Sequence, residues 1–206
     1  MNRLLQLGNL PVTSSVVASL YPDIIAVNKK LSKMEGDGVL LRLKRGLYVV
    51  SPEISGKRLS QGLISNDIYF PSYISRHTAL RFYGLIPETV FTVQAMTIKH
   101  SRNFVNEVGR FEYVHISREA FPIGLTRKRE GDVTFIIATP EKALCDLIAS
   151  TSGLVLRYKS EAVRYLEEDL RFDMDCLEGM DADVFERYIE VGKKADSIRT
   201  ILKLIR

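Results

Sequence analysis

The sequence has few cysteines and histidines and lacks long apolar runs, the features that build disulfides, metal centres and membrane spans. Its two cysteines, Cys145 and Cys176, lie far apart in apolar segments with helical patterns, which favours buried reduced thiols over a disulfide or a metal site. No apolar run approaches membrane-spanning length, and polar residues and a proline interrupt residues 1–22, which excludes a signal-peptide core. We therefore expect a soluble, intracellular protein of the cytoplasm that has no membrane partner.

The motifs of common catalytic and cofactor sites are also missing. The three histidines, His77, His100 and His115, are widely spaced and have no close ligand partners. The sequence contains no Gly-rich phosphate loop, no nucleophile elbow and no paired-cysteine motif. We therefore predict that the protein is not an enzyme and has no catalytic residue, metal site or cofactor.

The segment from Pro22 to Val50 carries the strongest pattern that is present. At about 100° of rotation per residue, a helix over residues 24–34 places its apolar and its cationic side chains on different faces. The apolar stripe contains Ile24, Val27, Leu31 and Met34, and the opposite side carries Lys29 and Lys33, with Lys30 at its edge. Asp23 is the expected cap of this helix, and the glycines of residues 36–38 are expected to end it.

A β-hairpin is predicted directly after this helix. Val39, Leu41 and Leu43 alternate with Leu40, Arg42 and Lys44, and residues 44–46 then read as a tight turn before a β-prone strand at residues 47–50. Two short helices are predicted upstream, the second capped by Thr13 or Ser14. Closely spaced helices followed by a cationic hairpin are typical of a winged helix-turn-helix, in which one helix enters a DNA groove.

The distribution of charge supports a polyanionic partner for the amino end. Lys and Arg outnumber Asp and Glu by 9 to 4 in residues 1–60 and by 10 to 9 in residues 61–150, whereas Asp and Glu prevail by 12 to 10 in residues 151–206. Duplex DNA would be drawn to the cationic end, with an affinity that falls as salt increases.

Length and periodicity predict two domains of an α+β (mixed α/β) protein. We place a winged helix-turn-helix domain at residues 1–55 and a larger mixed domain that ends in helices at residues 56–206. In the larger domain, strands are expected at residues 90–97, 111–117 and 133–138. Helices are expected after Ser75 and after the Thr139-Pro140 pair, with Ser75 and Thr139 as caps.

Several short motifs, in this order and spacing, resemble the AbiEi family of antitoxins from type IV toxin-antitoxin (abortive infection) systems. They are Arg45-Gly46-Leu47-Tyr48, Tyr73-Ile74-Ser75 with Ala79-Leu80 and Gly84-Leu85, and Ala138-Thr139-Pro140-Glu141-Lys142-Ala143-Leu144 with Asp146. The resemblance covers roughly residues 10–150. It implies a repressor that autoregulates its operon by binding double-stranded promoter DNA. It also implies an antitoxin whose carboxy-terminal domain counters a nucleotidyltransferase-like toxin, with or without a stable direct complex.

The candidate DNA-binding residues follow from both the residue pattern and the resemblance. They are Asn28, Lys29, Lys30 and Lys33 on the predicted recognition helix, and Arg42, Lys44 and Arg45 on the wing. Lysines on such a surface mostly neutralise phosphates, so they are expected to set affinity and salt dependence. Asn28 could read adenine if it faces outward, and base preference could also lie around Ser32.

Three further segments have a structural interpretation that we favour over a functional one. Lys142 and Asp146, four residues apart, are interpreted as support for a helix surface rather than as catalytic groups. Arg127, Lys128 and Arg129 are interpreted as a solvated turn between strands, with a second nucleic-acid contact as the alternative. The helix within residues 193–206 is expected to pack on the domain rather than meet a partner.

Two functions of other classes remain open at this point. One is a metal-dependent DNA-processing enzyme that uses a cluster of carboxylates in the middle domain. The other is a protein-interaction module whose winged helix does not bind DNA.

Overall fold

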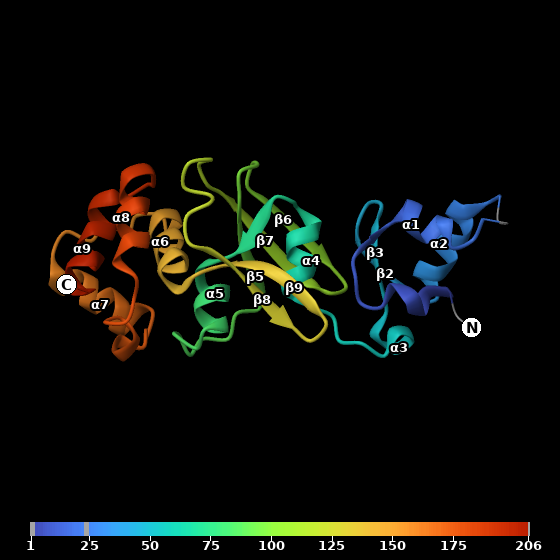
Figure 1. The fold of residues 1–206 in the computed structure, drawn as a ribbon, viewed down its shortest axis with the longest axis horizontal. Coiled ribbons are helices and arrows are strands. Elements are labelled where there is room, and N and C mark those ends of the chain that lie inside the picture. The colour runs from blue at the N-terminus through green and yellow to red at the C-terminus, as the bar shows by residue number, and fades with distance from the viewer. Residues whose placement is uncertain (1–2, 23–24, 206) are drawn as a thin grey trace.

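A computed structural model describes residues 3–22 and 25–205 and confirms the α+β class (Figure 1). Figure 1 shows an elongated molecule with the amino-terminal elements at one end, a mixed sheet in the middle and the last helices at the other end. We call residues 3–22 and 25–55 the N-terminal lobe and residues 56–205 the second lobe. Among the helices described, none is both long and apolar enough to cross a bilayer.

The N-terminal lobe surrounds a small three-stranded sheet of order β1-β3-β2. Its elements are η1 (Arg3–Leu7), β1 (Val12–Thr13), α1 (Ser14–Ser19), α2 (Val27–Gly36), β2 (Leu40–Lys44), β3 (Leu47–Val50) and α3 (Pro52–Ser55). Thr13 caps α1 as predicted, since its side chain accepts a hydrogen bond from the Val16 amide at 3.4 Å. The predicted tight turn is also present, and Gly46 adopts there a left-handed φ of +77° that an L side chain rarely tolerates.

Helix α2 differs from its prediction at its start. Asp23 and Ile24 lie outside the described residues, and the helix begins at Val27 with Ala26 in the cap position and no side-chain cap. Strand β2 also departs from simple alternation, because Leu40 and Leu43 are both buried and the register shifts between Arg42 and Lys44. At such an irregularity the side chains of a strand no longer alternate strictly between the two faces of the sheet.

The β2–β3 hairpin packs on both of its faces. Tyr48 and Val50 belong to the hydrophobic cluster of the N-terminal lobe, whereas Leu47 and Val49 belong to the large cluster of the second lobe. Adjacent residues of a strand point to opposite faces, so β3 joins the two cores. Its continuous apolar run, Leu47 to Val50, is that of a strand covered on both sides.

The second lobe is built on a six-stranded mixed sheet of order β6-β7-β5-β4-β9-β8. Its first elements are α4 (Gln61–Ile68), β4 (Ser72–Ile74), α5 (Arg76–Phe82), β5 (Thr92–Thr97), β6 (Arg102–Asn106), β7 (Gly109–His115), β8 (Leu125–Glu130) and β9 (Val133–Ala138). They are followed by α6 (Pro140–Ser150), α7 (Lys159–Arg164), η2 (Tyr165–Asp169), η3 (Met174–Cys176), α8 (Ala182–Val191) and α9 (Ala195–Ile205). The three predicted strands correspond to β5, β7 and β9, whereas β4, β6 and β8 were not predicted.

The interpretation of Arg127, Lys128 and Arg129 as a turn was wrong. All three lie within β8, an edge strand that pairs antiparallel with β9 from Leu125 to Glu130. Charged side chains on an edge strand hinder its pairing with another chain. A strand that needs polar residues for this reason lacks the apolar alternation by which strands are predicted.

Helix α6 confirms its predicted start but not the predicted exposure of its charged pair. The Thr139 hydroxyl accepts from the Lys142 amide at 3.4 Å, and Pro140 occupies the first turn. Lys142 and Asp146, however, have fully buried side chains, with Lys142 Nζ 3.2 Å from Asp146 Oδ1. The pair is therefore part of the core, because helices and strands distant in sequence cover it.

Hydroxyl groups from three other elements complete this buried cluster. Tyr73 and Ser75 donate to Asp146 Oδ2 at 2.9 and 2.7 Å, and Tyr188 donates to Asp146 Oδ1 at 3.0 Å. Ser75 precedes α5 as predicted but does not cap it, since its hydroxyl is directed to Asp146. Lys142 Nζ also donates to the Ala120 carbonyl at 2.7 Å, so both charges of the pair are compensated.

The expectation of buried thiols is confirmed for Cys145 and wrong for Cys176. Cys145 is buried, but Cys176 is exposed on η3, where its thiol donates to Asp173 Oδ2 at 3.4 Å. That hydrogen bond raises the pKa of the Cys176 thiol. Helix α9 packs on the domain as expected, with Ile198 and Ile201 fully buried.

Two glycines with the same backbone conformation allow a test of this packing. Gly124 and Gly131 have φ values of +58° and +59°, but a Cβ at Gly124 would lie 2.7 Å from Lys142 Cβ and 3.0 Å from Val184 Cγ1, whereas a Cβ at Gly131 would meet nothing within 4 Å. We expect Gly131→Ala to lower the free energy of unfolding by about 1 kcal/mol through backbone strain alone. Gly124→Ala is expected to cost roughly 1–3 kcal/mol more through overpacking. Urea titrations of both variants measure the difference, and equal costs would show that the space beside α6 is not filled as described.

Candidate nucleic-acid interface

Helix α2 presents a polar, cationic face to solvent. Leu31 and Met34 are buried in the N-terminal cluster, whereas Asn28, Lys29 and Lys33 are exposed. The helix therefore has the two faces that the sequence predicted, although it begins later. An exposed amide beside two exposed ammonium groups is suited to contact both base edges and phosphates.

Lys30 lies at the edge of this face and is held by an aromatic ring. Its Nζ is 5.3 Å from the centroid of Tyr21, and the guanidinium carbon of Arg3 is 5.7 Å from the same ring. Arg3 also donates to the Leu20 carbonyl at 2.7 Å. Arg3 and Tyr21 were not predicted as part of this surface, because only the fold brings η1 and Tyr21 beside this helix.

The predicted wing residues lie in three different environments. Arg45 is exposed in the turn between β2 and β3. Arg42 is partly exposed, and its Nη1 lies 3.5 Å from Glu35 Oε1 of α2, which links the strand to the helix. An exposed ion pair of this kind contributes little to stability, so Arg42 remains available to another anion.

Lys44 is directed toward the second lobe and away from the α2 face. Its Nζ donates to the Ile68 carbonyl at 2.5 Å, and Asn106 Nδ2 of β6 donates to the neighbouring Leu43 carbonyl at 3.0 Å. Burial lowers the pKa of Lys44, and the positive charge of Lys99 lowers it further. The structure thus places Lys44 where the two lobes meet, apart from the predicted DNA-binding residues of α2.

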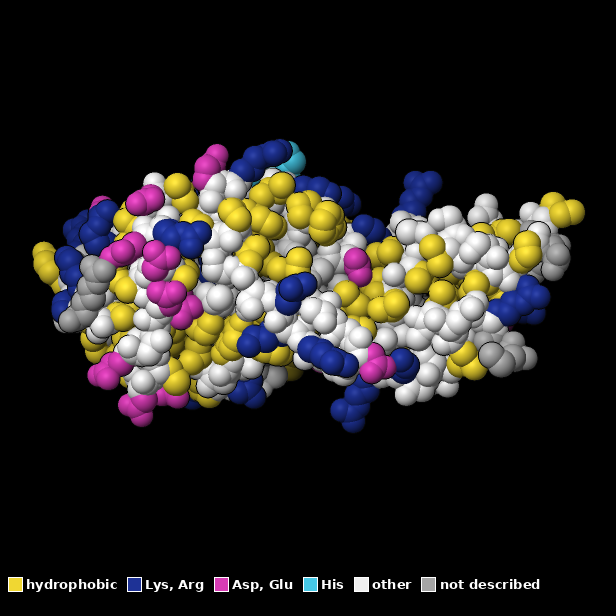
Figure 2. All heavy atoms as spheres, in the orientation of Figure 1, with side chains coloured by type: hydrophobic (Ala, Val, Ile, Leu, Met, Phe, Trp, Pro, Cys, Tyr) yellow, Lys and Arg dark blue, Asp and Glu magenta, His cyan; other side chains and the backbone are white. Residues whose placement is uncertain are grey.

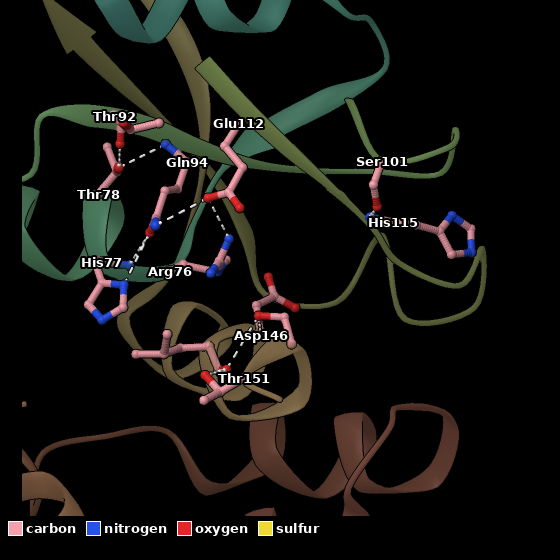
Figure 3. Close-up of polar contacts among 12 residues, drawn as sticks. Arg76, His77, Thr78, Thr92, Gln94, Ser101, Glu112, His115, Asp146 and Thr151 are labelled. Atoms are coloured by element: carbon pink, nitrogen blue, oxygen red, sulfur yellow. Dashed lines mark hydrogen bonds and ion pairs between the residues drawn. The ribbon is translucent and has the colours of Figure 1, made fainter. Parts of the chain in front are cut away.

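In the second lobe, the polar residues of β5, β7 and α5 form a network on one face of the sheet (Figure 3). Arg76 Nη1 lies 2.9 Å from Glu112 Oε2, and Gln94 Nε2 donates to the same oxygen at 3.3 Å. Gln94 Oε1 in turn accepts from the His77 amide at 3.1 Å. Figure 3 shows Arg76, Gln94 and Glu112 pointing toward one another, with Asp146 on the neighbouring helix.

These contacts bear on the idea of a metal-dependent enzyme, which requires a cluster of free carboxylates. Glu112 accepts from Arg76 and Gln94, and Asp146 is surrounded by Lys142 and three hydroxyl groups. His77 Nδ1 lies 3.2 Å from Gln94 Oε1, and His115 Nδ1 lies 3.0 Å from the Lys99 carbonyl. Within residues 3–22 and 25–205, no three His, Cys, Asp or Glu side chains are grouped so that they could hold a metal ion.

In comparisons with known proteins, neither a family model nor a curated sequence matches this chain. We therefore infer its function from the placement of its own residues and from the resemblance of its short motifs. By their placement, the exposed cations of α2 and of the β2–β3 turn are the strongest candidates for a functional site.

Proposed function

We propose that the protein is a DNA-binding transcriptional repressor whose N-terminal lobe is a winged helix-turn-helix. The exposure of Lys29 and Lys33 on the face of α2 opposite its buried stripe, with Asn28 exposed at the edge of that face, is the observation that carries the proposal. In this assignment α1 and α2 form the helix pair, α2 is the recognition helix and the β2–β3 hairpin is the wing. The order α1, α2, β2, β3, with β1 closing the sheet, supports it.

The roles of the individual residues follow from their chemistry. Lys29 and Lys33, one turn apart on the same side of α2, neutralise phosphates, and Asn28 offers an amide to the base edges. Lys30, held against Tyr21, contributes positive potential at the edge of the same face. Arg45 contacts phosphate from the turn of the wing. The amino end of the chain carries the largest excess of positive charge, which supports this direction of binding.

Fluorescence anisotropy with the full chain tests the proposal. The probe is a labelled 30-base-pair duplex from the DNA directly upstream of the gene, and the competitor is a scrambled duplex of equal composition. We expect the upstream duplex to bind more tightly, with log affinity falling linearly as log salt concentration rises. Absence of binding to any upstream fragment at low salt would contradict the proposal and would favour a protein-interaction module.

We further propose, from the resemblance to the AbiEi family, that the second lobe makes the protein an antitoxin. The motif that begins at Ala138 supplies Thr139 and Pro140 to the start of α6 and Lys142 and Asp146 to the buried cluster, so in this chain it builds the core of the lobe. The partner would be a nucleotidyltransferase-like toxin encoded beside this gene. Growth of cells that express the neighbouring gene alone, with the full chain, or with the full chain carrying Lys29→Glu/Lys33→Glu would test the assignment. Rescue by both full-length chains is the expected result, because the two substitutions lie in the N-terminal lobe.

A further inference from the structure

Two cations of the second lobe lie over a pair of aromatic rings where the lobes meet. Lys99 Nζ is 5.1 Å from the ring centroid of Tyr69, and the guanidinium carbon of Arg102 is 4.9 Å from the centroid of Phe104. The two rings are themselves in contact, with centroids 5.6 Å apart. Lys99 and Arg102 are both exposed, so the rings hold their charges at the surface.

Positive charge extends from this pair of cations to the β2–β3 hairpin. Lys44 reaches the carbonyl of Ile68, the residue before Tyr69, and the positive charges of Lys99 and Arg102 both lower its pKa in addition to burial. Arg45 follows Lys44 in the exposed turn. We call Lys44, Arg45, Lys99 and Arg102 the junction strip. Figure 2 shows Lys and Arg side chains along this edge of the molecule, from the end of the sheet that carries β6 and β7 to the hairpin.

The positive charges of Lys99 and Arg102 both oppose the charge of Lys44, and Asp67 is a carboxylate that partly offsets it. A bound polyanion would relieve this repulsion. The strip is held in place by the hydrogen bonds from Lys44 to Ile68 and from Asn106 to Leu43, which fix the hairpin on the second lobe. Cations grouped at one junction attract a duplex, which carries one phosphate charge per about 1.7 Å of its axis.

We propose that DNA bound at α2 and the wing extends over the junction strip, so that Lys99 and Arg102 of the second lobe bind its phosphates. This inference rests on the proposed function and extends the DNA-binding surface beyond the N-terminal lobe. Contacts to phosphates carry no sequence information by themselves. The strip therefore raises affinity for every duplex and leaves the preference for the upstream sequence unchanged.

The test compares Lys99→Gln/Arg102→Gln and Lys99→Glu/Arg102→Glu with the wild type in the anisotropy assay. The control for the second variant is Lys159→Glu/Lys203→Glu, which makes the same change in net charge at two exposed positions of α7 and α9. We expect the glutamine variant to bind both duplexes about tenfold more weakly and the glutamate variant more weakly still. The plot of log affinity against log salt concentration has a negative slope. The magnitude of this slope should decrease by about 2 in the glutamine variant, close to 1 for each lost phosphate contact.

The outcomes separate this inference from the proposed function. If the wild type binds the upstream duplex and the glutamine variant shows wild-type affinity and salt slope, the junction strip does not contact DNA although the repressor assignment stands. If the wild type binds no duplex, both are wrong. Thermal unfolding verifies that the variants are folded. If the glutamate variant does not fold, the milder glutamine variant still tests the inference. An equal loss of affinity in the Lys159→Glu/Lys203→Glu control and the glutamate variant would likewise overturn the inference, since net charge alone would explain it.

Discussion

Replacing Lys29 and Lys33 with glutamate is expected to weaken the binding of duplex DNA by about 100-fold at moderate salt. Each reversal removes one cation–phosphate attraction and adds one repulsion of similar size, and at about 1 kcal/mol per contact at 4 Å in water the two reversals sum to several kcal/mol. Both side chains are exposed on α2, opposite the buried Leu31 and Met34. Fold stability should therefore change by less than about 0.5 kcal/mol. Anisotropy and thermal unfolding of the same samples measure the two effects.

Two further variants sharpen this test. Lys159→Glu/Lys203→Glu carries the same change in net charge at the acidic end of the molecule and should keep nearly all of the affinity. Asn28→Ala should reduce the preference for the upstream duplex over the scrambled one, because it removes an amide that reads bases rather than a charge. Wild-type affinity of Lys29→Glu/Lys33→Glu at low salt would exclude α2 as the recognition helix.

Replacing Asp146 with alanine is expected to cost about 3–5 kcal/mol of unfolding free energy. The change leaves the ammonium of Lys142 fully buried without its counter-charge and removes the acceptor for the hydroxyls of Tyr73, Ser75 and Tyr188. Domains are typically stable by about 5–15 kcal/mol, so the loss is a large part of the total. The temperature of unfolding should fall by roughly 10 °C for a chain of this size.

Two further variants show whether the burial of the Lys142–Asp146 pair causes this loss of stability. Asp183 and Arg187 form an ion pair of the same i,i+4 spacing on α8, but their side chains are 64% and 55% exposed. Asp183→Ala should therefore change stability by less than about 1 kcal/mol. Adding Lys142→Met to Asp146→Ala should recover part of the loss, because the unpaired buried charge is gone. A similar cost for Asp146→Ala and Asp183→Ala would mean that the buried cluster is not formed.

The cluster also shows why its role was not predicted from the sequence. A Lys and an Asp four residues apart on a helix are usual on a solvated face, and nothing local distinguishes this pair from Asp183 and Arg187. The difference arises from Tyr73, Ser75 and Tyr188, which are 73, 71 and 42 residues from Asp146 in the chain. Only the packing of β4 and α8 against α6 brings them to one place.

For the buried side of α2 and the start of α6, local patterns were sufficient. The apolar spacing of Leu31 and Met34 set the buried side of the helix, and the Thr139-Pro140 pair marked the start of α6. Edge strands β6 and β8 were not predicted from the sequence. Much of each strand is exposed to solvent, so neither needs alternating apolar residues.

The sequence by itself determined the α+β class, the amphipathic α2 with exposed Lys29 and Lys33, and the turn at Arg45, because periodicity and glycine conformations act over a few residues. The tertiary structure decided that Lys44 points to the second lobe and that Lys99 and Arg102 join it in one strip. It also decided that Lys142 and Asp146 lie in the core. Contacts between residues far apart in the chain depend on how whole elements pack, and no local pattern specifies that packing.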